Sequence, residues 1–324
     1  MGAAIVWNPG AGGAADLIVD DIAARVGGDG APAAVYAITA DRDPAACARA
    51  ALADGADPII AAGGDGTVSA VAGVLAGGPA RLGVLPVGTS NSFAAALDLP
   101  AALEPAIATV RAGQERVVDV ARVRCGDARR IMILHTVIGL HAAAVVGASR
   151  QAKQRWGLLA YAASTARELG DLASFEVALE VNQREIRCRA IDVAVANLAP
   201  PRTVYAHGPA RLAPDDGLID VTIVAAETLT GAIAAGLHLY RSARQGTPAT
   251  RDDIGFLSCA RVRIATTPVR EVLVDGERLG DTPVELDVWP GALRVLAPPP
   301  PPDDRDAARG VKLAGLPDLE IGPS

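Results

Sequence analysis

The sequence lacks several features that mark secreted, zinc-binding or nucleic-acid-binding proteins. Aromatic residues make up 3% of its 324 residues, and the net charge is −7. An acidic chain repels phosphate backbones, which argues against broad nucleic-acid binding. The cysteines contain no Cys-x-x-Cys pair, so we expect no zinc knuckle and instead reduced thiols in a cytosolic protein. They are Cys47, Cys125, Cys188 and Cys259.

Neither a secretory signal nor a clear membrane span is expected from the sequence. The first apolar run, residues 3–7, has no basic region before it. Residues 131–149 carry no formal charge and are long enough to span a bilayer. Glycines and histidines interrupt them, however, so we expect a strand, a tight loop and a short helix. We therefore predict a cytosolic protein without a transmembrane segment, peripheral at most to the inner face of the membrane.

What the sequence does contain is a glycine-rich turn after an apolar run. Residues 58–67 read Pro-Ile-Ile-Ala-Ala-Gly-Gly-Asp-Gly-Thr, and apolar residues then recur at helical spacing. A strand, a glycine turn and a helix N-terminus together favour phosphate binding, because backbone amides and the helix dipole face the anion. Asp65 would repel a bare phosphate and so indicates a divalent cation between them. An ordinary tight turn is the alternative.

The first 114 residues alternate strands with helices. We expect strands at 3–7, 33–38, 58–62 and 81–86, and helices at 14–26, 44–53, 67–76 and from the loop 87–92 to Leu97. This alternation predicts an α/β domain with a parallel sheet, whose ligands bind beyond the carboxyl ends of the strands. The glycine-bearing loops 8–13, 63–67 and 87–92 all follow strands, so they should converge on one side.

The pattern changes at about Glu115, where short alternating runs indicate an antiparallel, β-rich second domain. The runs are 116–124, 130–138, 175–181, 186–195, 218–224, 261–266, 269–274 and 284–288, with helices at 157–172 and 228–244. We therefore divide the chain into a nucleotide-binding domain, 1–114, and a β-rich lipid-substrate domain, 115–297. The Pro-rich tail, 298–324, is expected to be extended or disordered.

Six motifs occur in an order that resembles the diacylglycerol kinase catalytic-domain family. They are Asn8-Pro9 with the glycines after it, Gly63–Thr67, Leu85–Phe93, Val118–Val120, Asp215–Asp220 and Val274–Glu277. The family includes soluble bacterial lipid kinases and the sphingosine and ceramide kinases. The resemblance covers about residues 3–297, and it implies an active cleft between the two domains.

The resemblance also implies a reaction and a set of site residues. The reaction is Mg²⁺-dependent transfer of the ATP γ-phosphate to a hydroxyl of a diacylglycerol-like or sphingoid-like lipid. ATP would contact Asn8, Thr39, Gly63, Gly64, Asp65, Gly66, Thr67, Gly88, Thr89 and Asn91. Glu277 would act as the base, and Asp65 and Asp119 would organise the catalytic Mg²⁺. A second Mg²⁺ would be held by Ala213, Asp216 and Leu218, through backbone oxygens and one carboxylate.

Each acidic motif also has a structural explanation. Asp275-Gly276 could close a hairpin, Asp215-Asp216-Gly217 could form a turn, and Asp119 could cap a strand start. Two acids common in the family are replaced here by Ser92 and Ala70, which lowers the expected metal affinity.

Two other functions stay open: an NAD-kinase-like enzyme that phosphorylates a soluble nucleotide, and a non-catalytic relative that binds nucleotide or lipid. The cluster Arg150–Arg155 before Trp156 is either a solvated helix start or a patch for anionic lipid. We expect His135 to be a structural histidine. The oligomeric state is left open, with a homodimer as one possibility.

Overall fold

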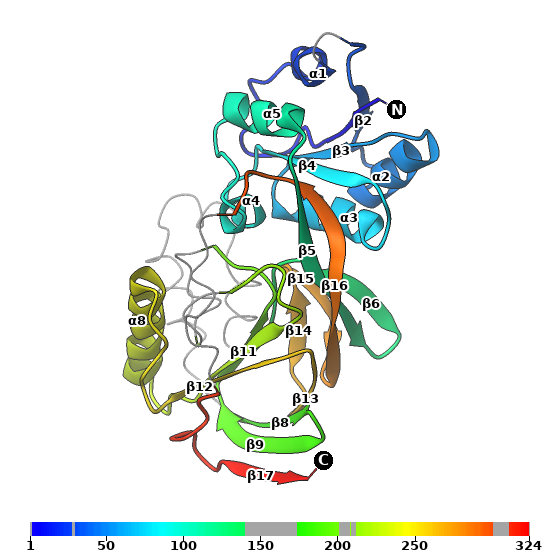
Figure 1. Ribbon diagram of the computed structural model, residues 1–324. Helices are drawn as coiled ribbons and strands as arrows, with labels where there is room; N and C mark the ends of the chain where they lie inside the picture. Colours follow the sequence, from blue (N-terminus) through cyan, green and yellow to red (C-terminus); the bar gives the residue numbers. More distant parts are fainter. Residues whose placement is uncertain are drawn as a thin grey trace. The chain divides into compact units, whose positions relative to one another are not determined.

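The computed structural model describes residues 2–27, 30–139, 174–200, 208, 212–300 and 311–323. Its contacts divide the chain into two compact units. The first unit contains residues 1–120, 214–216 and 289–303, and the second contains 121–213, 217–288 and 304–324. Figure 1 shows the helices and parallel strands of the first unit and the strands of the second. The predicted class, an α/β domain followed by an antiparallel β-rich domain, is confirmed.

The first unit is built on a parallel sheet with the strand order β4-β3-β1-β2. Its strands are β1 (Ala4–Trp7), β2 (Ala34–Ala37), β3 (Ile59–Gly63) and β4 (Arg81–Pro86). Every residue of β1 and β3 is buried, as expected where helices cover both faces of a sheet. The last part of β16 (Val284–Leu296) pairs in parallel with β4 through Arg294 and Val295.

Five helices accompany this sheet: α1 (Val19–Gly27), α2 (Pro44–Ala53), α3 (Asp65–Leu75), α4 (Ser92–Ala96) and α5 (Leu103–Ala112). The bounds of α2 are those predicted from the sequence, because the signals for the start of the helix are strong. Asp43 caps the helix by accepting a hydrogen bond from Ala46 N at 2.6 Å, and Pro44 follows. Helix α1 begins five residues later than expected, because residues 11–17 form turns. The sequence reading missed α5.

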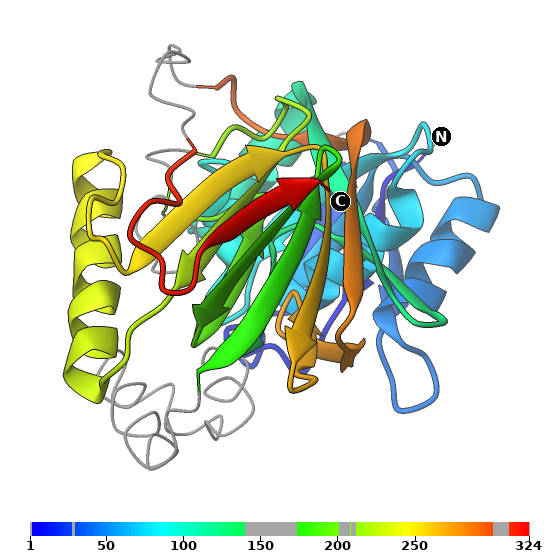
Figure 2. The same cartoon turned by 90° about the horizontal axis from the view of Figure 1, so that it is seen from below.

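The second unit is a sandwich of two antiparallel sheets (Figure 2). One sheet has the order β17-β9-β8-β13-β16 and the other β12-β11-β10-β7-β14-β15. The strands of the first sheet are β8 (Phe175–Val181), β9 (Arg184–Ala190), β13 (Arg261–Thr267), β17 (Glu320–Pro323) and the start of β16. Those of the second are β7 (His135–Gly139), β10 (Asp192–Ala196), β11 (Ile219–Val224), β12 (Ile254–Cys259), β14 (Glu271–Val274) and β15 (Glu277–Asp281).

One apolar core lies between these sheets. Val177, Ile264 and Leu286 enter it from one sheet, and Ile138 and Val221 enter it from the other. Strand β5 (Glu115–Cys125) runs from the first unit into the second, where its end forms a hairpin with β6 (Ala128–Met132).

Two of the expected runs contain two strands each. Residues 130–138 are divided between β6 and β7, and 186–195 between β9 and β10. The first break falls at Ile133 and Leu134, which are buried and carry no turn signal in their sequence. Strands β12, β15 and β17 are likewise absent from the sequence reading.

The tail was expected to be extended or disordered, and for residues 311–323 the disordered alternative is wrong. Strand β17 pairs with β9, and Lys312 exchanges backbone hydrogen bonds of 2.7 and 2.9 Å with Phe256. Leu313 and Leu316 are buried in the core of the sandwich. Burial of two leucines favours an ordered segment. The proline run and the charges that precede this segment in the sequence suggest disorder instead.

Helix α8 (Leu229–Gln245) agrees with the predicted helix at 228–244 to within one residue at each end. The other predicted helix of this half, 157–172, lies outside the described residues. Among the helices that the structure describes, none combines the length and the apolar character needed to cross a bilayer.

Candidate active site

Three glycine-bearing loops of the first unit converge, as the parallel strand order requires. Asn8 Nδ2 donates a hydrogen bond to Thr67 Oγ1 at 3.0 Å, which joins the loop after β1 to the first turn of α3, directly after the glycine turn that follows β3. Gly13 N donates to the carbonyl oxygen of Val87 at 2.8 Å. The predicted convergence of loops 8–13, 63–67 and 87–92 is therefore confirmed.

Glycine is required where two of these loops meet. A Cβ atom at Gly88 would lie 2.3 Å from the Cα atom of Gly64, and one at Gly63 would lie 2.4 Å from Thr67 Oγ1. Both distances are shorter than side chains tolerate, so a substitution at Gly88 would push the two loops apart and one at Gly63 would displace the Thr67 side chain. The close approach leaves backbone as the main surface of the loop, which suits a phosphate.

Asp65 begins α3, and it also joins two loops. Its Oδ1 accepts a hydrogen bond of 3.0 Å from the backbone N–H of Phe93, in the first turn of α4. The N-cap of α3 is Gly64, which has no side chain to cap the first amides. The positive end of the helix dipole therefore lies beside the buried Thr67, the exposed Gly66 and the half-buried Asp65.

Asn91 shapes the loop after β4. Its backbone is left-handed, with φ 51°. Its Oδ1 accepts from Gly88 N at 3.0 Å, and its Nδ2 donates to the carbonyl oxygens of Pro86 and Gly88 at 3.0 and 2.9 Å. Both ends of the Asn91 amide therefore hold the loop closed, and its contribution to a nucleotide site is to position the backbone.

Thr39 and Thr89 are exposed at the same edge of the sheet. Strand β2 pairs with β1 in parallel, so Thr39 leaves the sheet beside Asn8. A Cβ atom at Gly12 would lie 3.1 Å from Thr89 Oγ1, which places Thr89 against the loop after β1. All ten residues predicted to contact ATP thus lie at the carboxyl ends of the parallel strands.

Asp119, by contrast, is held by the backbone around it. It is 3% exposed, its Oδ1 accepts from Gly291 N at 2.7 Å, and its own N–H donates to the Pro214 carbonyl at 2.7 Å. These contacts give the acid a structural role, but Asp119 lies inside β5 and not at a strand start, as the structural alternative had it. Its role toward a metal stays a prediction.

The other predicted metal residues, Ala213, Asp216 and Leu218, lie on the loop that leads into β11. In the part of the chain that the structure describes, no three His, Cys, Asp or Glu side chains gather where they could hold a metal ion. A site built from three or more of these side chains is therefore not found among the described residues. One carboxylate with backbone oxygens, as the resemblance implies for this loop, stays a prediction.

The Asp275-Gly276 pair forms a two-residue hairpin between β14 and β15. Both residues have positive φ, 50° and 85°, as the favoured hairpin turns require, and Val274 pairs with Glu277 across the turn. The hairpin alternative is therefore correct as a description of the backbone. It does not exclude a chemical role for Glu277.

The Asp275 carboxylate accepts three backbone hydrogen bonds. Oδ2 accepts from Ile133 N at 3.0 Å, and Oδ1 accepts from Leu134 N at 2.9 Å and His135 N at 3.1 Å. These bonds satisfy the amides where β6 ends and β7 begins. The sequence reading assigned no such role to Asp275, because its partners lie about 140 residues earlier in the chain.

Glu277 lies at the start of β15, with 66% of its side chain exposed. Its Oε2 accepts a hydrogen bond of 2.9 Å from Arg130 Nη1, on β6. The carboxylate is thus accessible to solvent and oriented by a cation. No sequence motif indicated Arg130.

The structure describes the predicted structural histidine, His135, but not the predicted basic cluster. His135 is half-buried in β7, and its backbone contacts Asp275 through both N–H and C=O. The cluster Arg150–Arg155 and Trp156 lie outside the described residues.

Two family models match the chain. The model of the diacylglycerol kinase catalytic domain matches residues 2–123. The model described as a YegS C-terminal NAD kinase beta sandwich-like domain matches residues 136–297.

The chain is also similar to curated proteins. An uncharacterised protein of Synechocystis is 34% identical over 74% of this chain. The match covers 54% of the length of that protein, so this chain spans about half of it. A diacylglycerol kinase of Mycobacterium tuberculosis is 28% identical over 77% of the chain and 79% of its own length.

The fold is shared with a diacylglycerol kinase of Bacillus anthracis, with a TM-score of 0.67 at 20% identity over 92% of this chain and 97% of that one. It is also similar to an archaeal NAD kinase solved with ATP, from Archaeoglobus fulgidus, with a TM-score of 0.52 at 13% identity over 91% and 93% of the two chains. The two family models together account for both units, and the chain belongs to the diacylglycerol kinase catalytic-domain family.

Proposed function

We propose that this protein is a lipid kinase that transfers the γ-phosphate of ATP to a hydroxyl group of a diacylglycerol-like or sphingoid-like lipid. The observation that carries the proposal is the convergence of three glycine-bearing loops at the carboxyl ends of β1, β3 and β4. Membership of a family whose relatives include a diacylglycerol kinase supports a lipid as acceptor.

The loops would bind the triphosphate through backbone amides. Gly64 and Gly66 leave the start of α3 unobstructed by side chains, so its first N–H groups can face an anion. Asn8, Thr67 and Asn91 make the hydrogen bonds that fix the loops, while Thr39 and Thr89 are exposed for direct contact. Transfer of a phosphoryl group depends mainly on such positioning.

The carboxylates present fit a Mg²⁺ ion that enters with the nucleotide. In kinases Mg²⁺ keeps several waters and is held by one or two carboxylates together with the phosphates. Such a bound ion neutralises the charge that develops on the phosphates. Asp65, whose Oδ1 accepts the hydrogen bond of the Phe93 amide, would hold this ion with the phosphates. Asp216, with Ala213 and Leu218, would hold a separate structural ion.

Glu277 would accept the proton of the lipid hydroxyl. Its carboxylate is exposed, the rigid two-residue turn fixes where it starts, and Arg130 orients it. An alcohol is a weak nucleophile, so a base at hydrogen-bond distance should accelerate transfer by about 10²–10⁴-fold.

Glu277→Gln tests this role, because the amide keeps the size of the side chain and loses the base. With radiolabelled ATP and extracted lipid, we expect kcat to fall by about 10²-fold or more while KM for ATP is unchanged. Glu176→Gln, at another exposed glutamate of the second unit, is the control. Wild-type turnover of Glu277→Gln would refute the base assignment.

The similarity to an NAD kinase keeps phosphorylation of a soluble dinucleotide as the second candidate. A third candidate is a protein that binds ATP without transferring its phosphate, because Ser92 and Ala70 occupy places where relatives carry acids. Binding of Mg·ATP with no labelled product from lipid or dinucleotide would identify it.

A further inference from the structure

Helix α8 has two faces of different character. Ala235, Leu239 and Ser242 are buried, and the two apolar ones pack with Ile254 and Phe256 of β12. This face anchors the helix to the sandwich. Both views in Figures 1 and 2 show α8 at the outer edge of the second unit.

The opposite face carries exposed apolar side chains. Ile233 is 50% exposed and Leu237 43%, and they are one helical turn apart. At about 100° per residue, Tyr240, Arg241 and Arg244 fall within the same arc of roughly 100°. The Arg244 guanidinium lies 5.9 Å from the centre of the Tyr240 ring. We call these five residues the α8 outer stripe.

The stripe is positively charged in an acidic protein. Helix α8 contains two arginines and no Asp, Glu or Lys over its 17 residues, whereas the whole chain has a net charge of −7. Exposed aliphatic residues, a tyrosine and arginines on one helix face are typical of a helix that lies in the interface of a bilayer. Arginine attracts anionic headgroups, and its aliphatic stem extends along the apolar region.

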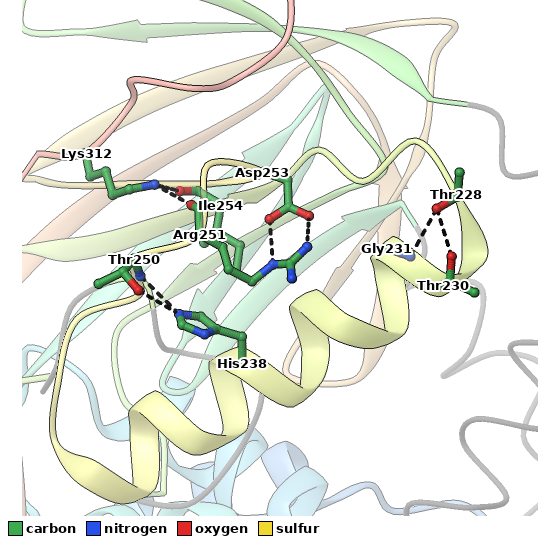
Figure 3. Close-up of polar contacts among 9 residues, drawn as sticks. All are labelled: Thr228, Thr230, Gly231, His238, Thr250, Arg251, Asp253, Ile254 and Lys312. Carbon is green, nitrogen blue, oxygen red and sulfur yellow. Dashed lines mark hydrogen bonds and ion pairs between the residues drawn. The ribbon is translucent and has the colours of Figure 1, made fainter.

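Hydrogen bonds fix the start of helix α8 and connect its middle to the segment that follows it (Figure 3). Thr228 caps its start by accepting from Gly231 N at 3.1 Å, and His238 Nε2 accepts from Thr250 N at 3.0 Å. Lys312 Nζ donates to the carbonyl oxygens of Arg251 and Ile254, which fixes the segment after the helix. A preformed face loses little entropy on binding.

From this arrangement we infer that the α8 outer stripe docks the protein on an anionic lipid surface. Ile233, Leu237 and Tyr240 enter the headgroup boundary, and Arg241 and Arg244 bind the anionic headgroups. A second copy of the chain is less complementary, since it would present the same stripe, which offers two arginines and no acid to pair with them. The inference rests on the proposed function: it names the surface by which an enzyme that acts on lipid would reach its substrate.

The test is sedimentation of the full-length protein with vesicles that contain no acceptor lipid. We expect binding to phosphatidylcholine vesicles with about one third phosphatidylglycerol, weaker binding at high salt, and little binding to pure phosphatidylcholine. The double variants Ile233→Ser/Leu237→Ser and Arg241→Gln/Arg244→Gln should each lower the partition coefficient on the order of 10-fold.

Two matched variants control for a general loss of apolar surface or charge. Val269→Ser/Val311→Ser removes two exposed apolar residues outside α8, and Arg129→Gln/Arg184→Gln removes two exposed arginines of β6 and β9. Both should bind like the wild type. Failure of the wild type to bind anionic vesicles, or equal binding by all variants, would overturn the inference. So would a wild-type dimer that dissociates in the Ile233→Ser/Leu237→Ser variant without any vesicle binding.

A second assay separates this inference from the proposed function. With a short-chain acceptor dissolved below its micelle concentration, transfer requires no membrane, so the α8 variants should keep the wild-type kcat. Vesicle binding without any transfer to lipid would contradict the proposed function alone. Transfer to the dissolved acceptor with no vesicle binding would contradict the docking inference alone.

Discussion

At the residue scale, Asp275 and Glu277 have opposite surroundings although one residue separates them. The Asp275 carboxylate satisfies three backbone amides of residues 133–135. Glu277 is exposed, and its carboxylate contacts the side chain of Arg130. The first arrangement indicates a contribution to stability, and the second leaves a carboxylate accessible to substrate.

Asp275→Ala should therefore destabilise the protein more than most substitutions. It leaves three amides without their acceptor, which we expect to lower the free energy of unfolding by about 2–4 kcal/mol. Urea denaturation followed by circular dichroism measures this value. Asp127→Ala, in the exposed β5–β6 turn, is the control and should change stability by less than about 0.5 kcal/mol. A similar stability of both variants would show that the three bonds contribute little.

Asp57 predicts a dependence of stability on acid pH. Burial raises the pKa of its carboxyl, but hydrogen bonds from Arg81 N and Nε, with the nearby charge, outweigh burial and hold that pKa below its usual value. A carboxyl with a lowered pKa in the folded state stabilises the protein above its unfolded-state pKa, and this stabilisation is lost as the pH falls through the folded-state pKa.

Asp57→Asn should thus be less stable than the wild type near neutral pH by about 1 kcal/mol, and the difference should shrink below about pH 4. Thermal midpoints measured between pH 3 and pH 7 give the comparison. Asp98→Asn, at an exposed position with positive φ that asparagine also tolerates, is the control. A difference that stays constant with pH would contradict the role of the charge.

Residue roles could be predicted only where local sequence determines them. Gly63, Gly64 and Gly88 were predicted as loop residues because glycine alone permits the close approach that the structure contains. The partners of Asp65, Asp119 and Asp275 could not be predicted, because each is a backbone amide brought near by the fold. A backbone amide leaves no signal in the sequence.

At the scale of elements, residues 311–323 form a C-terminal segment that packs on the rest of the second unit, and we call it the strap. Leu313 and Leu316 fill the sandwich core, and β17 covers the edge of β9. An uncovered edge strand offers unpaired backbone groups to other chains. The strap therefore both stabilises the sandwich and protects one of its edges.

Removal of residues 301–324 should lower the free energy of unfolding by several kcal/mol and promote aggregation, since two buried leucines and one strand pairing are lost. Leu313→Ser/Leu316→Ser in the full chain should reproduce much of the loss. Ile321→Ser, at a residue 54% exposed on β17, should not. A truncated protein with wild-type stability and solubility would show that the strap is dispensable.

Element prediction succeeded where the hydrophobic pattern and the boundary signals agreed. Strands β4 and β8 and helix α2 were predicted with their observed bounds. Strand β15 was missed because its sequence, Glu-Arg-Leu-Gly-Asp, has almost no apolar residues to alternate. Residues 277–281 form a strand because they pair with β14. Tertiary context, and not the local hydrophobic pattern, therefore determines the structure of this segment.

At the scale of the whole molecule, the α/β unit and the β-rich sandwich each follow from the sequence. Regular alternation of strands and helices predicted the parallel sheet, and short alternating runs predicted the antiparallel one. The paths of β5 and β16, which contribute residues to both units, could not be predicted, because they depend on pairings distant in sequence.

The central claim, transfer of phosphate from ATP to a lipid hydroxyl, is tested most directly by one competitive reaction. The protein is given γ-labelled ATP and Mg²⁺ with diacylglycerol micelles, a sphingoid base and NAD⁺ at equal concentrations, and the products are separated into organic and aqueous phases. We predict label in a lipid of the organic phase, dependent on Mg²⁺ and strongly reduced in Asp65→Asn. Label in the aqueous dinucleotide, or in neither phase while ATP still binds, would contradict the account.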